Sequence, residues 1–219
     1  MRSVVSDVPK SMALVRGKPF LHYLFLHLEK SGIEKVVLSV GYKSEIIEQY
    51  FGQIYAGLSV EYAYEKEALG TGGGIRLAME KCSGAHVLAM NGDSFFDYSL
   101  SHLFEKHLSG SADITIALRK VDDASRYGTV QLEGERIMAF REKSPEAKGP
   151  ALINSGIYVI RKKTYMGLTE ANKTFSIEQD FFSKYAGKLW MQGAPGADYF
   201  IDIGIPEDYA RAQVEFENL

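Results

Sequence analysis

Short apolar runs alternate with amphipathic segments through the first half of the sequence, and this alternation constrains the fold more than any other feature. Residues 35–41, "KVVLSVG", form an apolar run bounded by glycine, as a strand buried on both faces does. In residues 18–32 the apolar positions recur at helical spacing. The same patterns predict further strands at 58–64, 85–90 and 113–121, and further helices at 43–51, 74–82 and 97–108. This rhythm predicts an open, mostly parallel sheet in a three-layer α/β architecture.

The second half of the chain is richer in strands. Its patterns predict strands at 128–133, 136–142, 151–160, about 188–192 and 199–204, and helices at 176–186 and from Pro206. A length of 219 residues suits one domain. We therefore expect a single domain over residues 1–219, with a nucleotide-binding half at about 1–120 and a β-rich half at about 121–219.

Composition narrows the class of protein. The net charge of −3 gives no basic surface for nucleic acid, so we expect no nucleic-acid partner. The sequence has no apolar run of membrane-spanning length and no signal-peptide core, so we expect no membrane association. The single cysteine, Cys82, excludes an intramolecular disulfide and a cysteine zinc site, which favours a reducing compartment. We expect a cytoplasmic protein.

A glycine-dense segment, "ALGTGGGIR" at residues 68–76, lies between a predicted strand and a predicted helix. It is not a P-loop, because Ile75 and Arg76 stand where Gly-Lys-Ser/Thr would follow, and Ile75 also breaks the dinucleotide pattern G-x-G-x-x-G. Bare backbone lets a ligand lie against the chain and meet its N–H and C=O groups. A flexible turn and a backbone platform for a ligand are the two interpretations.

Two aspartates follow predicted strands. Asp93 lies in "MNGDSFF", and Asp202 lies in "FIDIGIPEDY" between two isoleucines. Ligands of open α/β sheets bind at the carboxyl ends of the strands, and Mg²⁺ takes one or two carboxylates besides phosphate oxygens. Both residues could instead serve turns or helix caps. As metal ligands they would have to converge on one cation, which the sequence alone does not establish.

Seven short motifs occur together in a fixed order. They are V-P-K, L-G-T-G-G, N-G-D, Y-G-T-V, R-E-K, N-S-G-I-Y and F-I-D-I-G-x-P-E-D-Y. From about Ser3 to Gln213 this set resembles the sugar-1-phosphate nucleotidyltransferases, most of all the branch of D-glycero-α-D-manno-heptose 1-phosphate and mannose 1-phosphate guanylyltransferases. The resemblance implies a three-layer α/β/α, Rossmann-like open mixed sheet of the nucleotide-diphospho-sugar transferase type, with a β-rich sugar-binding half.

The resemblance also implies a reaction, in which a sugar 1-phosphate and a nucleoside triphosphate give an NDP-sugar and pyrophosphate for cell-surface polysaccharide synthesis. It implies that Asp93 and Asp202 hold Mg²⁺. It implies that Lys10 meets the triphosphate and Lys143 the sugar phosphate, so that Lys10, Asp93 and Lys143 carry the catalysis. The further residues that it implies are Gly70, Thr71 and Gly72 against the nucleobase and ribose, and Gly128, Glu142 and Asn154 facing the sugar.

Glu65 precedes the glycine-dense segment and indicates the base. Uridylyl- and thymidylyltransferase relatives usually carry Gln at this position. A carboxylate only accepts hydrogen bonds. Guanine offers N1–H and the 2-amino group as adjacent donors, whereas uracil and thymine offer one donor between two carbonyls. We therefore expect GTP as the nucleotide, with a surface role for Glu65 as the alternative.

The start of the sequence departs from the family pattern. The family opens with a buried strand and the loop G-G-x-G-T-R-L around the triphosphate, and alignment on Pro9 and Lys10 places Met1 at the leucine of that loop. An upstream start, a shortened sequence and a degenerate relative each fit this departure. We expect the chain as written to have little or no activity.

Other functions stay open at this point. A non-catalytic homologue that binds nucleotide sugars and regulates, or a thymidylyl- or uridylyltransferase, would use the same motifs. A metal-dependent glycosyltransferase would want an Asp-x-Asp motif, which neither Asp122-Asp123 nor Asp93-Ser94 supplies. The sequence leaves the sugar and the oligomeric state open, with a homodimer as one option.

Overall fold

The computed structural model describes residues 8–124, 128–141, 149–196 and 199–217. Contacts group the chain into two compact units. Unit 1 comprises Met1–Glu67, Asn91–Phe96 and Tyr199–Leu219, and unit 2 comprises Ala68–Met90 and Asp97–Asp198. Unit 1 thus combines both ends of the sequence. The expected single domain with functional halves divided near residue 120 stays a prediction.

Unit 1 contains a three-stranded sheet in the order β3-β5-β4. β3 (Lys35–Val40) and β5 (Leu58–Tyr64) are parallel, and β4 (Ile54–Tyr55) is antiparallel to β5. Two further strand pairs are antiparallel: β1 (Leu14–Val15) with β2 (Lys18–Pro19), and β7 (Ser94–Phe96) with β13 (Phe200–Asp202). The helices are η1, a 3-10 turn (Lys10–Met12), α1 (Phe20–Lys30), α2 (Ser44–Phe51) and α7 (Pro206–Glu215).

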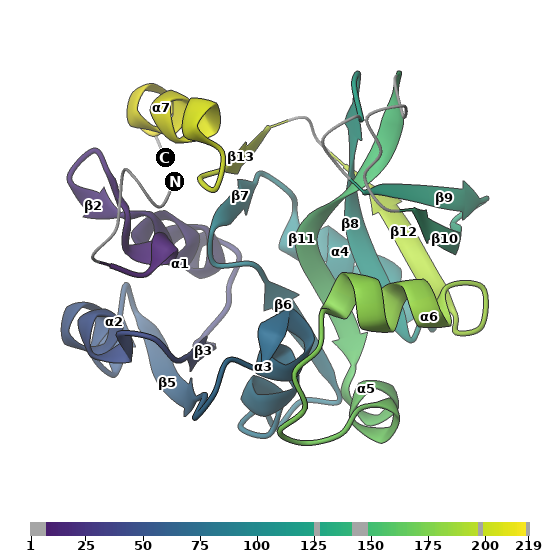
Figure 1. Ribbon diagram of the computed structural model, residues 1–219, viewed down its shortest axis with the longest axis horizontal. Coiled ribbons are helices and arrows are strands. Elements are labelled where there is room, and N and C mark those ends of the chain that lie inside the picture. The colour runs from purple at the N-terminus through teal and green to yellow at the C-terminus, as the bar shows by residue number, and fades with distance from the viewer. Residues whose placement is uncertain (1–7, 125–127, 142–148, 197–198, 218–219) are drawn as a thin grey trace. The chain divides into compact units, whose positions relative to one another are not determined.

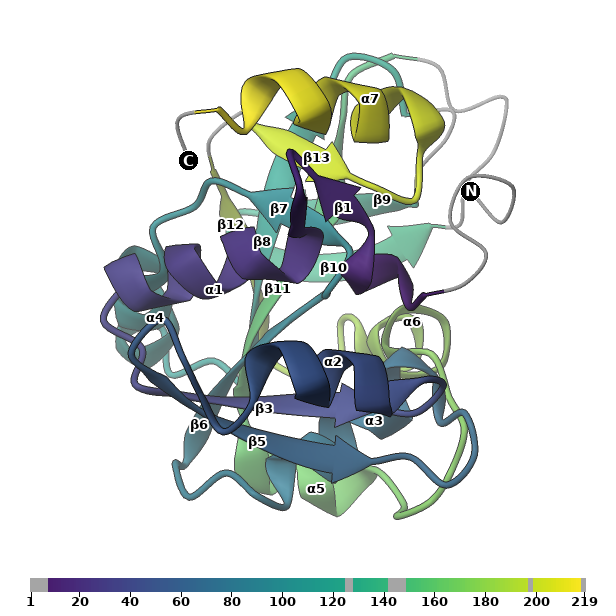
Figure 2. The same cartoon turned by 90° about the vertical axis from the view of Figure 1, so that its left-hand side faces the viewer.

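Aromatic side chains fill the interior of unit 1. Phe25 of α1 stacks on Phe51 of α2 with ring centroids 4.9 Å apart. Phe216, just after α7, contacts Phe20 of α1 at 5.8 Å and Phe95 of β7 at 5.4 Å. These contacts tie both ends of the sequence to the short β7–β13 pair, beside which α7 lies in Figure 2. The amphipathic pattern that predicted α1 is therefore the pattern of its buried face.

Unit 2 is built on a six-stranded mixed sheet in the order β6-β11-β8-β12-β10-β9 (Figure 1). Its strands are β6 (His86–Met90), β8 (Ile114–Val121), β9 (Thr129–Glu133), β10 (Arg136–Arg141), β11 (Ala151–Arg161) and β12 (Met191–Pro195). Its helices are α3 (Gly70–Met79), α4 (Leu100–Ser109), α5 (Lys162–Leu168), the π-helix η2 (Ile177–Phe182) and α6 (Ser183–Tyr185).

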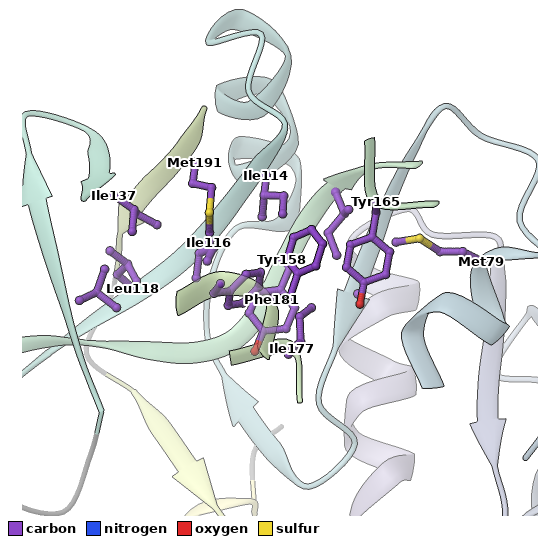
Figure 3. Packing of buried hydrophobic residues seen from close by; sticks show 14 residues of the cluster. Met79, Ile114, Ile116, Leu118, Ile137, Tyr158, Tyr165, Ile177, Phe181 and Met191 are labelled. Carbon is purple, nitrogen blue, oxygen red and sulfur yellow. The ribbon is translucent and has the colours of Figure 1, made fainter. Parts of the chain in front are cut away.

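Helices cover both faces of this sheet. Ile114, Ile116 and Leu118 alternate along β8 and pack on one face with residues of α3, α5 and η2 (Figure 3). Thr115 points to the opposite face, where its hydroxyl meets His107 of α4 at 2.9 Å. In Figure 1, α4 lies behind the sheet and α5 and α6 lie in front. The three layers predicted from the sequence are thus present in unit 2.

Most predicted elements are confirmed, and the differences have local causes. The helix predicted at 74–82 begins earlier in the structure. The glycines from Gly70 onward form the first turn of this helix, α3, instead of a loop before it. The expectation of mostly parallel strands is wrong within unit 2, where β11 runs antiparallel to β6, β8 and β9, and β12 runs parallel to β8. Among the described residues, no helix combines the length and apolar character that a membrane span requires.

Candidate functional site

Strand pairing in unit 1 brings Asp93 and Asp202 to one place. β7 and β13 pair so that Asp202 lies opposite Ser94, and the Ile203 N–H donates to the Asp93 carbonyl oxygen at 3.1 Å. Buried Phe95 and Ile201 hold the pair against the interior. The acidic residues therefore stand at the same end of the pair, one before β7 and one at the end of β13.

Lys10 completes this group. It begins η1 after Pro9, and the turn is closed by the Ala13 N–H, which donates to the Lys10 carbonyl oxygen at 2.9 Å. The Lys10 ammonium nitrogen lies 3.8 Å from Asp93 Oδ2, with the Lys10 side chain 61% exposed and that of Asp93 37% exposed. Both charged groups are thus reachable from solvent, as binding of a phosphate or a cation requires.

Asp93 and Lys10 lie close enough to Asp202 for their charges to affect its pKa. Burial raises the pKa of Asp202, and the negative charge of Asp93 raises this pKa further. The hydrogen bond from the Gly204 N–H to Asp202 Oδ1, at 2.7 Å, and the positive charge of Lys10 act in the opposite direction. A divalent cation between the two carboxylates would relieve their repulsion.

The donor set fits Mg²⁺. This cation binds through one or two carboxylates together with phosphate oxygens and water. Within the described ranges, no group of three or more His, Cys, Asp or Glu side chains is arranged to hold a metal. A pair of carboxylates such as Asp93 and Asp202 would leave coordination positions of the cation open to water or phosphate oxygens.

Glu65 lies at the carboxyl end of the parallel strands β3 and β5. Its backbone N–H donates to the Val40 carbonyl oxygen at 2.8 Å, and the Ser39 hydroxyl donates to Glu65 Oε1 at 2.8 Å. The carboxylate is half-buried and held by its neighbour strand. Ligands of parallel sheets gather at this edge. Sequence reasoning did not identify Ser39, because a single serine within a strand carries no pattern.

The glycine-dense segment packs on its own chain. The Gly72 N–H donates to the Phe175 carbonyl oxygen at 3.0 Å, and the Ile177 N–H donates to Thr71 Oγ1 at 3.0 Å. A Cβ on Gly72 would lie 2.1 Å from the Phe175 ring, and Gly70 has a φ of +69°. Close packing within unit 2 therefore accounts for Gly72. Gly70 and Thr71 are exposed, and their contact with a nucleobase stays a prediction.

Asn154 is fixed within unit 2 by three hydrogen bonds. Its amide nitrogen donates to the Tyr158 hydroxyl at 2.7 Å and to Glu178 Oε1, and its Oδ1 accepts from the Gly156 N–H at 2.9 Å. Glu178 lies in η2 and was not singled out from the sequence, because π-helical geometry has no signature there. The carboxylate of Glu178, in the sequence "SIEQD", is the feature that could have marked it as a candidate site residue.

Of the other residues predicted to bind the sugar or its phosphate, the structure describes one. Gly128 is exposed just before β9, and a Cβ there would lie 3.2 Å from the Arg141 carbonyl oxygen. Glu142 and Lys143 lie outside the described residues. Their contacts with a sugar phosphate stay predictions.

Comparison with known proteins gives consistent matches over the whole length. Residues 1–218 match the family described as nucleotidyl transferase. The chain is 45% identical to the D-glycero-alpha-D-manno-heptose 1-phosphate guanylyltransferase of Aneurinibacillus thermoaerophilus, over all of this chain and 94% of that protein. It is 41% identical to the protein of the same name from Campylobacter jejuni, over 95% of this chain and 91% of that protein.

A solved structure also matches. It is HddC from Yersinia pseudotuberculosis complexed with GMP-PN, with a TM-score of 0.87 at 34% identity, covering 99% of this chain and 94% of that chain. This match confirms the mixed α/β fold class expected from the sequence.

Proposed function

The chain belongs to the nucleotidyl transferase family, as its motifs predicted, and we propose that it transfers a guanylyl group from GTP to a sugar 1-phosphate of the heptose or mannose type. The observation that carries the proposal is the meeting of Asp93 and Asp202 beside Lys10. Relatives at 45% and 41% identity bear the name of a heptose 1-phosphate guanylyltransferase, and the matching HddC structure contains a guanine nucleotide analogue. These names support both the base and the acceptor.

The reaction requires that the negative charge of the phosphates is neutralised and that the attacking oxygen is aligned with the α-phosphorus. A sugar-phosphate oxygen attacks the α-phosphorus of GTP, a new P–O bond forms, the bond to the β-phosphate oxygen breaks, and pyrophosphate leaves. The attacking phosphate is ionised near neutral pH, since its second pKa is about 6, so no general base is required. Asp93 and Asp202 would hold Mg²⁺, which when bound neutralises phosphate charge.

The cationic residues have separate roles in this proposal. Lys10 binds oxygens of the triphosphate and stabilises negative charge that develops at the α-phosphorus. Lys143 binds the sugar phosphate, with Glu142, Gly128 and Asn154 toward the sugar hydroxyls. The Lys10 side chain supports its role because it is exposed and lies beside Asp93. The roles of the residues proposed to bind the sugar and its phosphate rest on the family motifs.

Guanine recognition is assigned to Glu65. An ionised carboxylate has about four lone-pair positions, so Glu65 Oε1 can accept from Ser39 and still accept from guanine. The bond from Ser39, at 2.8 Å, holds the carboxylate in place before a nucleotide arrives. Gly70, Thr71 and Gly72 are proposed to line the base and ribose.

The function is tested by binding and product formation. Calorimetry with Mg²⁺ should show GTP bound at least about tenfold more tightly than UTP, dTTP or ATP, the preference expected from paired hydrogen bonds to a charged group. Pyrophosphate release and mass spectrometry with heptose and mannose 1-phosphates should then identify the GDP-sugar. Tighter binding of UTP or dTTP would contradict the proposal. Rapid turnover would overturn the expectation of little activity.

A base-specificity variant sharpens this test. Glu65→Gln presents both a donor and an acceptor, so the GTP preference should fall or reverse toward UTP and dTTP. Ser39→Ala keeps the Glu65 carboxylate and removes only the hydrogen bond that the Ser39 hydroxyl donates to it. This variant should therefore bind GTP more weakly and keep the same order of nucleotide affinities. An unchanged preference in Glu65→Gln would exclude Glu65 as the base-reading residue.

A further inference from the structure

Asp208 reaches back from α7 to the backbone of Asp202. It lies in the first turn of the helix, and its Oδ2 accepts a hydrogen bond from the Asp202 N–H at 3.1 Å. Its side chain is 14% exposed, although the helix is on the surface of unit 1. A carboxylate in such a position is held by specific partners, because a buried charge without partners is costly.

A row of ionic contacts along α7 fixes Asp208 itself. Arg211 Nη1 donates to Asp208 Oδ1 at 2.9 Å. The same guanidinium is held on its other side by Glu215, with bonds of 3.0 Å to Oε1 and 3.2 Å to Oε2. The two oxygens of Asp208 thus have different partners, one on the helix and one at the end of β13. An acceptor fixed in this way can set the position of a backbone N–H.

From these contacts we propose that Asp208 is a positioning residue for Asp202. Its bond holds the last peptide of β13, and the Gly204 N–H holds Asp202 Oδ1 at 2.7 Å. Together the two bonds fix the backbone and the side chain of the same residue. The inference rests on the proposed role of Asp202 as a ligand of Mg²⁺, and it adds the residue that orients this ligand. Partners of this kind change metal affinity by about 10- to 100-fold when removed.

α7 is also attached to unit 1 by contacts that do not involve Asp208. Tyr209 Oη and Gln213 Nε2 both donate to the Leu14 carbonyl oxygen, at 2.7 and 2.8 Å. Ala212 and Phe216 are buried. Removal of the Asp208 carboxylate should therefore leave the helix in place and alter the geometry at Asp202.

The test measures metal binding directly. Mn²⁺ is titrated into the full chain and free Mn²⁺ is followed by electron paramagnetic resonance. Asp208→Ala should weaken Mn²⁺ binding about tenfold. Glu207→Ala is the matched control, because it removes a negative charge from the same helix turn, and it should bind Mn²⁺ as the wild type does. Asp208→Asn keeps an acceptor for the Asp202 N–H and should recover most of the lost affinity.

The outcomes separate this inference from the proposed function. Equal Mn²⁺ affinity in Asp208→Ala and wild type, with binding lost in Asp93→Asn, overturns the inference and leaves the metal site standing. Binding that is absent from wild type, or unchanged in Asp93→Asn, overturns the metal site and the inference with it. An equal loss in Glu207→Ala and Asp208→Ala would mean that charge alone acts, which also overturns a positioning role. Thermal melts of each variant verify folding.

Discussion

Gly72 belongs to a packing contact between parts of unit 2 that are far apart in the sequence. Its N–H is bonded to Phe175 and its carbonyl oxygen accepts from the Tyr165 hydroxyl at 2.9 Å. The sequence suggested a bare surface for a ligand, and the structure adds a different reason for the missing Cβ. A glycine-dense run by itself cannot distinguish a bound ligand from a close approach of the chain.

Replacement of Gly72 by alanine should destabilise the protein. The added Cβ would lie 2.1 Å from the Phe175 ring, so the ring must move, at a cost of about 1–3 kcal/mol. Urea denaturation measures the change. Gly167→Ala is the control, since it lies in α5 with open space around an added Cβ and should be neutral or stabilising by up to about 1 kcal/mol. Equal stability of Gly72→Ala and wild type would show that the contact with Phe175 is not tight.

At the scale of elements, long and periodic segments were predicted well and short ones were not. The helix at Phe20–Lys30 and the strand at Leu58–Tyr64 follow directly from their apolar spacing. β7 has three residues and was not among the predicted strands. Such a strand exists because β13 pairs with it and both are buried, and neither condition can be inferred from three letters.

A hydrogen-bonded row links α4 to the sheet of unit 2. His86 Nδ1 meets His107 Nε2 at 2.8 Å, and His107 Nδ1 meets the Thr115 hydroxyl at 2.9 Å. The Thr115 hydroxyl donates to Gln192 Oε1, and Gln192 Nε2 donates to Glu135 Oε2 at 2.8 Å. With the Thr115 hydroxyl donating to Gln192, His107 donates from Nδ1 and accepts at Nε2, which is the pattern of a neutral imidazole.

Acid should destabilise unit 2 through His107. Burial, followed by the nearby His86 and Arg161 and opposed by Asp113, lowers the pKa of His107 from 6.5 to about 4. Between these values the unfolded chain binds the proton and the folded chain does not. This contribution is therefore complete above about pH 6.5 and is lost as the pH falls toward 4, by up to about 3 kcal/mol.

Urea denaturation between pH 7 and pH 4.5 measures this effect. His107→Gln should flatten the pH dependence of the free energy of unfolding, even where its stability at pH 7 is lower. His102→Gln, on the exposed side of the same helix, should leave the slope unchanged. The same slope in His107→Gln as in wild type would assign the pH dependence to other groups.

For the whole molecule, binding of nucleotide and metal should raise the temperature of unfolding. At 100 times the dissociation constant, a ligand that binds only the folded state contributes about 2.7 kcal/mol, which corresponds to several degrees in a chain of this size. GTP with Mg²⁺ should raise the unfolding temperature more than ATP with Mg²⁺ does. Addition of EDTA, or the substitution Asp93→Asn, should reduce this rise. A shift that EDTA leaves unchanged would contradict the shared metal site. Scanning fluorimetry with ATP in place of GTP is the control for base preference.

The sequence by itself determined the fold class, most helices and strands, and the residue types of the site, because spacing and motif order are properties of neighbouring residues. It also selected Asp93, Asp202 and Lys10 without showing that they meet. Tertiary structure decided that meeting, through the β7–β13 register and the placement of η1 beside Asp93. The reason is physical: pairing of segments far apart in the sequence depends on which apolar side chains are buried together, and that is set by the folded interior as a whole.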